Sequence, residues 1–455
     1  MSKLAFLLGN KRIFLVGIGG ISMSGIARYL LGKGFKICGS DTHKNTVLEN
    51  LEGLGVKVYY EHNAKNVATA DLVVYSSAIS KDNPEIVYAK ENGIKIIKRS
   101  ELLGQILAEY KISIGVSGCH GKTTATAMLS SVLVTAGLDP TVFLGGEYGQ
   151  NGNFRKGNSR YALAEACEYK KSFLDIKPTI SVVLNIDNDH LESFNGTADM
   201  VDCFKRFVGD NLAVINADEK YAEYLCNCTS VTYGIKTNAT YYATNIKVGK
   251  NGVSFTANAF SLCYGRINLK VQGVHNVYNA LSAFATADIL GVPFFAVKKG
   301  LEDFSGVKRR NEFLGEKFSL SWFADYAHHP TEIKATLLAF INGGKDFITV
   351  FQPHTYSRTE LLMDDFIKVL LKIENLIVYK TYPAREKFNK NGDAKRLVEK
   401  LKEQGQNDCA YAQTVEELEK LIQDKAKNNR RILCLGAVDI YDIAKKILED
   451  KKELK

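Results

Sequence analysis

A glycine loop between an apolar run and a helix-like run constrains the fold of this chain more than any other feature. The loop reads Val-Ser-Gly-Cys-His-Gly-Lys-Thr-Thr over residues 116–124. The apolar run Ile112–Val116 leads into it, and the helix-like run Ala125–Ala136 follows it. The pattern therefore predicts a strand, a loop and a helix, with backbone N–H groups and the helix N-terminus pointing at one place.

The residues of this loop suit a phosphate ligand. Lys122 would bring positive charge to the outer phosphates of a nucleotide, and the Thr123 hydroxyl could reach Mg²⁺. The strict pattern has a glycine five residues before Gly121, where this chain has Val116, so the loop is a shorter variant. A tight strand–helix turn without a ligand is the alternative that the bare pattern leaves open.

Length and composition set the class of the protein. A chain of 455 residues predicts about three domains, and an apolar content of 45% allows each to bury a core. The net charge of +9 comes with dispersed lysines, which indicates a solvated surface; attraction of anionic substrates is the alternative. No basic block alternates with aromatic residues, so nucleic acid is not an expected partner.

Cysteine usage and hydropathy predict the compartment. Nine cysteines without a C-x-x-C pair indicate reduced thiols rather than a disulfide framework or a zinc site. Residues 1–9 are too few for a secretory leader. No run reaches the ~18 apolar residues of a membrane helix. We therefore expect a cytoplasmic protein without membrane insertion.

Strand-like and helix-like runs alternate along most of the chain, which predicts an α/β protein with parallel sheets. Between about 230 and 270, short strands split by Asn and Gly predict an antiparallel insertion with a hairpin at Val248–Val253. We expect three domains, at 1–107, 108–306 and 307–455. The expected strands are Arg12–Val16, Phe35–Cys38, Leu72–Tyr75, Ile94–Ile97, Tyr161–Ala166, Ile180–Leu184, Leu212–Ile215, Leu320–Ala324, Phe347–Phe351, Asn375–Val378 and Arg431–Cys434, and the expected helices include Ile21–Leu31 and Asn276–Leu290.

A second glycine motif follows the first expected strand. It reads Gly-Ile-Gly-Gly-Ile-Ser over residues 17–22, so Ser22 replaces the third glycine of the dinucleotide fingerprint. Asp41 ends the next strand, where a ribose-binding carboxylate would lie. The motif suits a diphosphate at a helix N-terminus, from either a nicotinamide cofactor or a nucleotide sugar. A tight turn without a ligand is again the alternative.

These motifs, together with further segments in the same order, resemble the Mur ligases nearly from end to end. Two departures are visible: Cys119 stands where the family usually has Thr, and Val438 where it usually has a second glycine. The segments that carry the resemblance are 17–27, 76–79, 83–85, 118–124, 164–174, 185–191, 275–280, 306–310, 325–332 and 351–359. The segments 325–332 and 351–359 are the most selective and point to the alanine-adding branch.

The resemblance implies a role for each matching residue. It implies a UDP-sugar site at Gly17, Gly19, Gly20, Ser22, Asp41, Ser76, Ser77 and Ala78. It implies an ATP site at Gly118, Cys119, His120, Gly121, Lys122, Thr123, Thr124, His275, Asn276, Asn279, Arg310 and Asp325. It implies metal ligands at Thr123, Glu165 and His190, an amino-acid site at Tyr326, His328, His354 and Arg358, and catalytic roles for Lys122, Glu165, His190 and Arg358.

The resemblance also implies the reaction and the fold. The expected reaction is ATP-dependent ligation of L-alanine to the lactyl carboxylate of UDP-N-acetylmuramate through an acyl phosphate, in peptidoglycan synthesis, with Mg²⁺ or Mn²⁺ as the metal. The expected fold has a Rossmann-like UDP-binding domain, a central P-loop-type ATP-binding domain and a C-terminal Rossmann-like domain. A monomer or weak homodimer is expected.

Taken alone, the residues have plainer interpretations, since Glu165 could be an edge residue, and His190 or Asp325 a helix cap. Three rival functions follow: a ligase that attaches a whole tripeptide, a nicotinamide oxidoreductase, and a binding protein without catalysis. The segment 351–359 argues against the first rival, and the second phosphate loop argues against the oxidoreductase. The presence of Lys122, Glu165 and His190 argues against the last.

Overall fold

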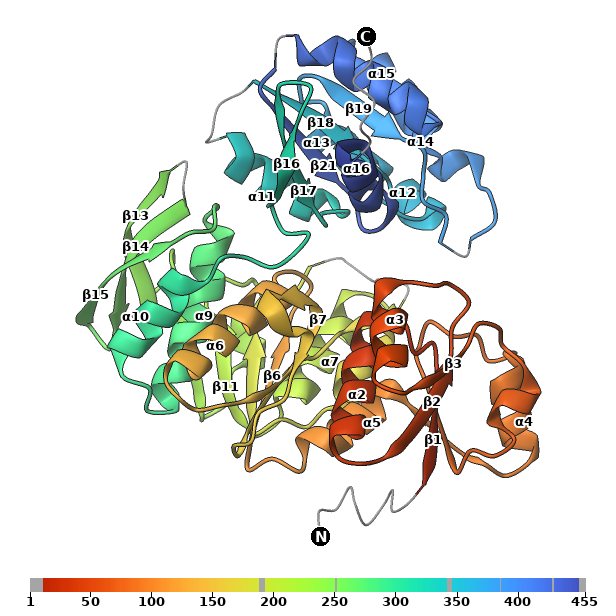
Figure 1. Cartoon of the computed structure of the whole chain (residues 1–455). Coiled ribbons are helices and arrows are strands. Elements are labelled where there is room, and N and C mark those ends of the chain that lie inside the picture. The colour runs from red at the N-terminus through yellow and green to blue at the C-terminus, as the bar shows by residue number, and fades with distance from the viewer. Residues whose placement is uncertain are drawn as a thin grey trace. The chain divides into compact units, whose positions relative to one another are not determined.

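The computed structural model describes residues 11–187, 193–249, 252–341, 346–384, 386–427 and 429–449. The chain divides into two compact units. The first unit runs to Ser305, and the second begins at Gly306; short segments at 248–253 and 271–274 group with the second unit. Figure 1 shows three sheets along the chain, two in the first unit and one in the second.

The N-terminal sheet is five-stranded and parallel, in the order β3-β2-β1-β4-β5. Its central strand forms because Ile13 to Val16 are apolar and fully buried, as expected for a strand covered on both faces. The strands are β1 (Arg12–Val16), β2 (Lys36–Ser40), β3 (Lys57–Tyr59), β4 (Leu72–Tyr75) and β5 (Lys95–Lys98). The helices are α2 (Ile21–Gly32), α3 (Thr46–Gly53), η1 (Ala64–Val67), α4 (Pro84–Glu91) and α5 (Arg99–Leu107).

The central sheet is ten-stranded, in the order β15-β14-β13-β12-β11-β10-β6-β9-β7-β8. Its strands are β6 (Ile112–Ser117), β7 (Thr141–Tyr148), β8 (Gly152–Arg155), β9 (Tyr161–Glu165), β10 (Ile180–Val183), β11 (Leu212–Asn216), β12 (Ser230–Gly234), β13 (Tyr241–Gly249), β14 (Gly252–Ala259) and β15 (Leu262–Leu269). Strand β12 pairs in parallel with β11 and with β13. The start of the expected antiparallel insertion therefore continues the parallel sheet, because β12 adds a strand to the edge at β11. The tip of the expected hairpin includes residues 250 and 251, which lie outside the described residues.

Helices pack closely on the central sheet. A Cβ on Gly300 of α10 would lie 2.6 Å from Val132 Cα of α6, and Ser131 Oγ donates to Gly300 O at 2.7 Å. A glycine at this crossing lets the two backbones touch. The helices of this region are α6 (Lys122–Thr135), η2 (Gly149–Asn151), η3 (Tyr169–Asp175), α7 (Thr197–Val208), α8 (Ala222–Leu225), α9 (His275–Ile289) and α10 (Phe294–Asp303).

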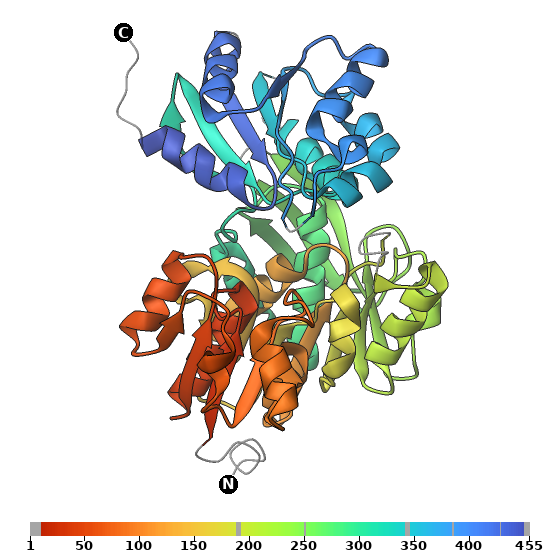
Figure 2. The ribbon, with the colours of Figure 1, turned by 90° about the vertical axis from the view of Figure 1, so that its right-hand side faces the viewer.

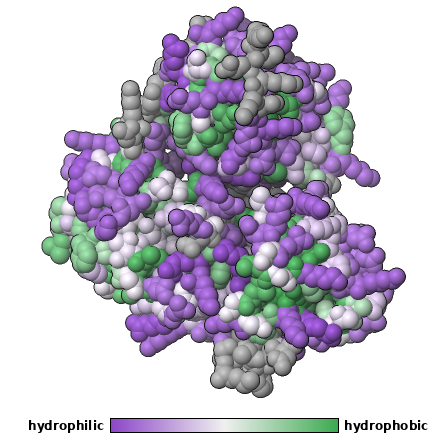
Figure 3. Space-filling model, in the orientation of Figure 1, coloured by the Kyte–Doolittle hydropathy of each residue, from purple (hydrophilic) through white to green (hydrophobic). Residues whose placement is uncertain are grey.

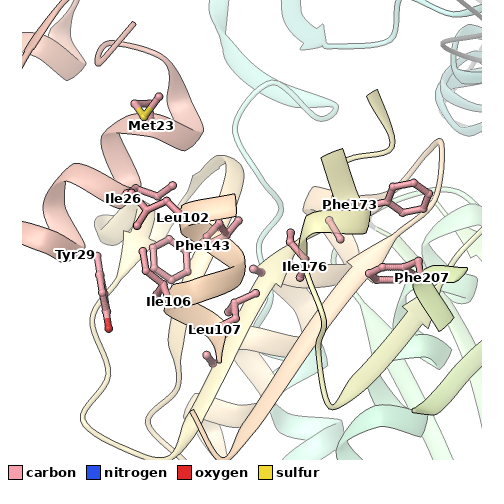
Figure 4. Packing of buried hydrophobic residues seen from close by; sticks show 14 of the residues in the cluster. Met23, Ile26, Tyr29, Leu102, Ile106, Leu107, Phe143, Phe173, Ile176 and Phe207 are labelled. Carbon is pink, nitrogen blue, oxygen red and sulfur yellow. The ribbon is translucent and has the colours of Figure 1, made fainter. Parts of the chain in front are cut away.

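The N-terminal and central sheets share one hydrophobic core. Figure 4 shows side chains of α2 and α5 beside Phe143 of β7 and Ile176, which follows η3. Polar contacts cross the same boundary, since Ser100 Oγ donates to Asp175 Oδ2 at 2.6 Å. A Cβ on Gly104 would lie 2.1 Å from Asp175 O, so α5 approaches this region as closely as a backbone allows. Both glycine loops therefore belong to one packed unit.

The C-terminal sheet is six-stranded, in the order β16-β17-β21-β18-β19-β20, and only β16 runs antiparallel to its neighbour. Two separate clusters of buried apolar residues lie against it, and helices flank the sheet in Figure 2. The strands are β16 (Glu312–Lys317), β17 (Leu320–Asp325), β18 (Phe347–Phe351), β19 (Leu376–Tyr379), β20 (Cys409–Ala412) and β21 (Arg431–Leu435). The helices are α11 (Pro330–Ile341), α12 (Tyr356–Leu361), α13 (Met363–Leu370), η5 (Lys390–Gly392), α14 (Ala394–Glu403), α15 (Val415–Ala426) and α16 (Asp439–Glu449).

The surface is mixed in character. Figure 3 shows a largely hydrophilic face with smaller hydrophobic areas. Among the described residues, no helix combines the length and the apolar content that crossing a bilayer requires. All nine cysteines are free thiols, and four of them are buried.

Candidate active site

The phosphate-loop candidate connects β6 to α6 (Figure 1). Both of its glycines have positive φ angles, which residues with a side chain rarely adopt. Gly118 has φ +139° and Gly121 has φ +83°. A Cβ on Gly121 would lie 2.7 Å from Asn279 Oδ1, and a Cβ on Gly118 would lie 3.0 Å from the backbone nitrogen of Asn185. Asn279 of α9 therefore lies directly against the loop, although 158 positions separate it from Gly121 in the sequence.

The segment after β10 fixes the middle of the loop. Asn185 accepts the backbone N–H of His120 at 2.8 Å and donates to His120 O at 2.9 Å. The Cys119 thiol donates to Asp187 O at 3.2 Å and accepts the backbone N–H of Asp187 at 3.1 Å. The thiol at 119 thus makes the donor and acceptor contacts of which a threonine hydroxyl is also capable. The same segment leads to His190, which lies outside the described residues.

Lys122, the first residue of α6, turns back into its own loop. Its Nζ donates to Gly118 O at 2.5 Å and to Cys119 O at 3.1 Å. It also forms an ion pair with Glu168, at 2.9 Å to Oε2 and 3.1 Å to Oε1. Burial is the largest single influence and lowers the pKa of Lys122, but Glu168, Cys167 and Cys119 together outweigh it and raise that pKa above its ordinary value. Lys122 is therefore a fixed positive charge.

Thr123 and Glu165 supply adjacent oxygen atoms beside the loop. Thr123 Oγ1 donates to Glu165 Oε2 at 3.0 Å, and the backbone N–H of Gly145 donates to Glu165 Oε1. A hydroxyl and a carboxylate are hard oxygen donors, which suit Mg²⁺ or Mn²⁺ rather than zinc. Thr124, next in the first turn of α6, is buried. Two of the three predicted metal ligands are thus brought together.

The first turn of α9 carries the predicted adenine-contacting residues. Asn279 Nδ2 donates to Asn276 Oδ1 at 3.0 Å, and Asn276 Nδ2 lies 3.2 Å from His275 Nε2. Asp218 accepts the Tyr278 hydroxyl at 2.7 Å in the same turn. Partial burial would raise the pKa of Asp218, but hydrogen bonds from Thr237, the backbone after β12 and Tyr278 lower it to about 2. This carboxylate ties the first turn of α9 to the segment after β12.

The predicted UDP-sugar residues gather at the carboxyl ends of β1, β2 and β4, and β1 lies between the other two in the N-terminal sheet. A Cβ on Gly17 would lie 3.3 Å from Ile79 Cδ1 and 4.0 Å from Ser76 Cβ, so the turn at 76–79 lies beside the glycine loop. Ser76 Oγ accepts the backbone N–H of Ala78 at 3.2 Å in that turn. The two predicted segments form one site candidate.

Asp41 and Ser22 hold the ends of this loop. Asp41 Oδ2 accepts the backbone N–H of Gly19 at 2.9 Å, and a Cβ on Gly19 would lie 2.9 Å from that oxygen. Gly20 precedes α2 in extended conformation, without a side-chain cap on the helix. Ser22 Oγ accepts from Arg99 Nη1 at 2.8 Å. Burial lowers the pKa of Arg99, and the guanidinium remains a positive charge near the start of α2.

Lys170 links this candidate site to the central domain. Its Nζ donates to Ser77 O at 2.6 Å, and its backbone N–H donates to Ser193 Oγ at 3.0 Å. Lys170 and Lys171 both have left-handed backbones, at φ +50° and +57°. Lys171 is held by Asp199, whose oxygens lie 2.7 and 2.9 Å from its Nζ. Two successive left-handed residues without glycine carry strain, which proteins retain mainly at functional sites.

In the second unit, predicted residues follow the carboxyl end of β17. Asp325 is buried and accepts the backbone N–H groups of Asn311 and Ala327, both at 2.8 Å. Burial raises the pKa of Asp325 above its ordinary value, although the nearby Arg310 opposes this. The Arg310 guanidinium lies 5.3 Å from the ring centroid of Tyr326 and 3.6 Å from Glu332.

The remaining predicted residues of this unit continue from there to the carboxyl end of β18. Glu332 Oε2 accepts the backbone N–H of His328 at 3.2 Å, and the rings of His328 and His354 lie 5.5 Å apart. Arg358 Nη1 lies 3.2 Å from His354 Nδ1. Because a guanidinium can only donate, Nδ1 of His354 accepts this bond and carries no proton. The four predicted amino-acid-binding residues therefore form one contiguous cluster with Arg310.

The structure brings the predicted residues into three groups. The first unit holds the UDP-sugar group and the phosphate-loop group, and the second unit holds Arg310, Asp325 and the amino-acid group. Glu168, Lys170, Arg99 and Asn185 also face these groups, and sequence reasoning assigned no role to any of them. The available signal was weak. Glu168, Lys170 and Asn185 lie within segments that resemble the family, whereas Arg99 lies in none of them. Their partners Lys122, Ser77, His120 and Ser22 are 46 to 93 positions away in the sequence.

Parallel α/β sheets with glycine loops between a strand and a helix are typical of nucleotide-binding enzymes. Family models match three successive ranges of the chain. They are the Mur ligase family, catalytic domain, over residues 12–111; the Mur ligase middle domain, over 116–287; and the Mur ligase, glutamate ligase domain, over 309–438.

Individual proteins match over the whole length. The UDP-N-acetylmuramate–L-alanine ligase of Acetivibrio thermocellus is 40% identical over 465 residues, covering 99% of each chain. The protein of the same name from Clostridium tetani is 41% identical over 446 residues, covering 96% of this chain and 97% of that protein. The crystal structure of UDP-N-acetylmuramate-alanine ligase from Thermotoga maritima has a TM-score of 0.84 at 30% identity, covering 96% of this chain and 98% of that one.

A murein peptide ligase from Psychrobacter arcticus, at 22% identity and a TM-score of 0.73, shares the fold. The chain belongs to the Mur ligase family. It is an ATP-dependent ligase of peptidoglycan synthesis. The predicted α/β fold with three domains is thereby confirmed.

Proposed function

We propose that this enzyme joins L-alanine to the lactyl carboxylate of UDP-N-acetylmuramate, with ATP as the second substrate. The products are UDP-N-acetylmuramoyl-L-alanine, ADP and phosphate. The observation that carries the proposal is the pairing of two glycine loops in one unit, one with Lys122 and Thr123 for ATP and one with Gly17 and Gly19 for the UDP-sugar. Hydride transfer would need only one such loop.

The chemistry explains why the phosphate loop has a buried lysine and an adjacent carboxylate. A carboxylate is a poor electrophile, so ATP converts it to an acyl phosphate, and this step brings two anions together. Lys122 supplies fixed positive charge at the place where negative charge develops. Thr123, Glu165 and His190 would hold Mg²⁺ or Mn²⁺, which when bound neutralises phosphate and carboxylate oxygens.

The second unit supports the amino-acid half of the reaction. Arg358 offers a guanidinium that can bind the alanine carboxylate in bidentate fashion. Its hydrogen bond from Nη1 to His354 Nδ1 fixes one edge of the guanidinium. Tyr326 and His328 lie in the same cluster and would shape the pocket around the alanine amine. Arg310 and Asp325 are proposed ATP-binding residues of this unit, and His275, Asn276 and Asn279 are proposed ATP-binding residues of the first unit.

The similarity to named relatives favours alanine over a tripeptide as the incoming amine. Proteins named as alanine ligases are 40% and 41% identical to this chain over nearly their whole length. We also propose domain boundaries at 107 and 306, a monomer or weak homodimer, and a cytoplasmic location. A reducing compartment suits Cys119, whose thiol hydrogen bonds would be lost on oxidation.

The test is phosphate release from ATP with Mg²⁺ and UDP-N-acetylmuramate, with each amino acid or the tripeptide added separately. We expect release that depends on L-alanine, and a product whose mass equals the UDP-sugar plus alanine less water. Phosphate release that depends on the tripeptide instead would make the enzyme a ligase that attaches a whole tripeptide to the UDP-sugar. No release with any amine would contradict the proposal.

A further inference from the structure

The ammonium of Lys122 has three N–H donors, and three groups already accept from it. They are Gly118 O, Cys119 O and Glu168 Oε1, at 2.5, 3.1 and 3.1 Å. A lysine has no further donor to offer. A phosphate oxygen can therefore reach Lys122 Nζ only by displacing one of these partners.

Glu168 is the charged partner in this set, and it is completely buried. The side chain of Lys122 is 15% exposed and that of Glu168 is 0% exposed, so water screens their attraction poorly. The backbone of Glu168 is also fixed, because its carbonyl accepts the N–H of Lys171 at 2.8 Å. Lys171 in turn is tied to Asp199 of α7. These contacts fix the main chain at Glu168, and this limits where its carboxylate can move.

We propose that Glu168 is a positioning residue: it holds the Lys122 ammonium in an ion pair in the nucleotide-free enzyme and releases it to phosphate oxygens when ATP binds. The inference rests on the proposed ATP site at residues 118–124. In the free enzyme, the pair keeps a buried ammonium from standing without a counter-charge. In the ATP complex, the phosphates replace the carboxylate as the counter-charge of Lys122.

This exchange predicts whether removal of the Glu168 charge raises or lowers the affinity for ATP. Removing the charge of Glu168 weakens the bond that ATP must displace, so the affinity for ATP rises. The same change leaves Lys122 buried with a weaker partner in the free enzyme, so the free enzyme becomes less stable. A residue that merely braces the fold would lower both the stability and the affinity.

The decisive variant is Glu168→Gln, which keeps the shape of the side chain and removes its charge. Calorimetric titration of the full chain with Mg·ATP should give a dissociation constant about tenfold lower than for wild type, which corresponds to about 1.4 kcal/mol. The melting temperature without nucleotide should fall, and its rise on adding Mg·ATP should grow. Steady-state kinetics should show a lower KM for ATP with kcat within about threefold of wild type.

Two further variants separate the explanations. In a Lys122→Ala background, Glu168→Gln should no longer improve ATP binding, because the stored group is gone. A gain of equal size in that background would mean that Glu168 simply repels phosphate, and would overturn the exchange. Should Glu168→Gln fail to fold, Glu168→Asp retains charge with a shorter reach and should give a smaller gain of the same sign.

Glu85→Gln is the matched control. Glu85 is also a fully buried glutamate of the first unit, but its partners are Ser40, His62 and Asn66. This variant should lower the melting temperature and leave ATP affinity unchanged. Weaker ATP binding by Glu168→Gln than by wild type would refute the inference, whereas equal ATP affinity of wild type and Lys122→Ala would refute the proposed ATP site itself.

Discussion

Thr123 Oγ1 and Glu165 Oε2 are joined by a hydrogen bond of 3.0 Å, which connects the first turn of α6 to the end of β9. Glu165 is also held by the backbone N–H of Gly145 on β7. A Cβ on Gly145 would lie 2.6 Å from Glu165 Oε2, so a glycine there makes room for the carboxylate. Three elements thus fix one carboxylate beside the phosphate loop.

We predict that Glu165→Ala and His190→Ala each raise the Mg²⁺ concentration needed for half-maximal activity and slow acyl phosphate formation. The reason is that both residues are proposed to hold one metal with Thr123. Residues that act as a unit are strongly non-additive, so the double variant should be little worse than either single variant. Full additivity of the two losses in rate would argue against a shared metal.

Lys122→Ala should abolish ligation and leave binding of UDP-N-acetylmuramate nearly intact. Loss of a charge-stabilising group of this kind lowers kcat on the order of 10²-fold or more. The UDP-sugar candidate at Gly17 and Ser76 lies on a different sheet, so its affinity should change little. Calorimetry with each ligand checks this, and a parallel loss of affinity for both would contradict the assignment of two sites.

Lys170→Ala should raise the KM for UDP-N-acetylmuramate by about three- to tenfold. Its ammonium lies on Ser77 O, within the predicted UDP-sugar segment, and an exposed charge there would attract the diphosphate or the carboxylate. Lys170→Gly removes the side chain and also relieves the left-handed backbone. This variant should therefore show the same KM effect with a higher melting temperature than Lys170→Ala.

The control for this prediction is Lys156→Ala. Lys156 is an exposed lysine of the same unit whose Nζ donates to Gly32 O at 3.3 Å. The loss of this contact should not alter the KM for the UDP-sugar. If the Lys156 and Lys170 variants behaved alike, the effect would reflect the net charge of the unit rather than a local contact.

Much of the fold could be predicted from the sequence because buried strands of parallel sheets are short apolar runs. The bounds of β1 and β4 match the expected runs residue for residue. Two kinds of strand were missed: the edge strand β3, which has only three residues, and β7, which lies between β9 and β8 and whose second half contains Gly145 and Gly146. Such strands are defined by their partners more than by their own side chains.

The candidate site divides in the same way. The glycines, Lys122 and Thr123 could be recognised because the loop is local in sequence. The contacts of Lys122 with Glu168 and of Lys170 with Ser77 span 46 and 93 positions. Neither Glu168 nor Lys170 could be assigned a role from the sequence, since a glutamate or lysine in isolation is usually a solvated surface residue. Tertiary packing alone gives them their partners.

Stability should depend on pH through Asp218, whose pKa of about 2 in the folded protein lies below the ordinary value of 3.8. A lowered pKa means that the contribution is present above about pH 4 and is lost as the pH falls through about 2. Because Asp218 is partly exposed, we expect about 1 kcal/mol. Asp218→Asn should lower the free energy of unfolding at neutral pH and reduce its loss between about pH 4 and pH 2, as measured by urea unfolding at each pH. An unchanged loss of stability over this pH range would contradict the prediction.

Arg358→Lys tests the proposed alanine site. The Arg358 guanidinium contacts His354 and belongs to the cluster after β17 and β18, so it can meet a carboxylate with two parallel N–H bonds. One ammonium cannot reproduce that fork, and the KM for alanine should rise about tenfold or more. The KM values for ATP and UDP-N-acetylmuramate should shift far less, because most of their proposed contacts lie in the first unit.

The alternative is that Arg358 only braces the segment at 351–359. In that case Arg358→Lys would lower the melting temperature and raise the KM values of all three substrates alike. A melting curve beside the three KM values separates the two outcomes. Selection against glycine is a further check, since it can draw on only about one buried methyl group, roughly 1 kcal/mol. An alanine KM that Arg358→Lys leaves unchanged would remove Arg358 from the alanine site.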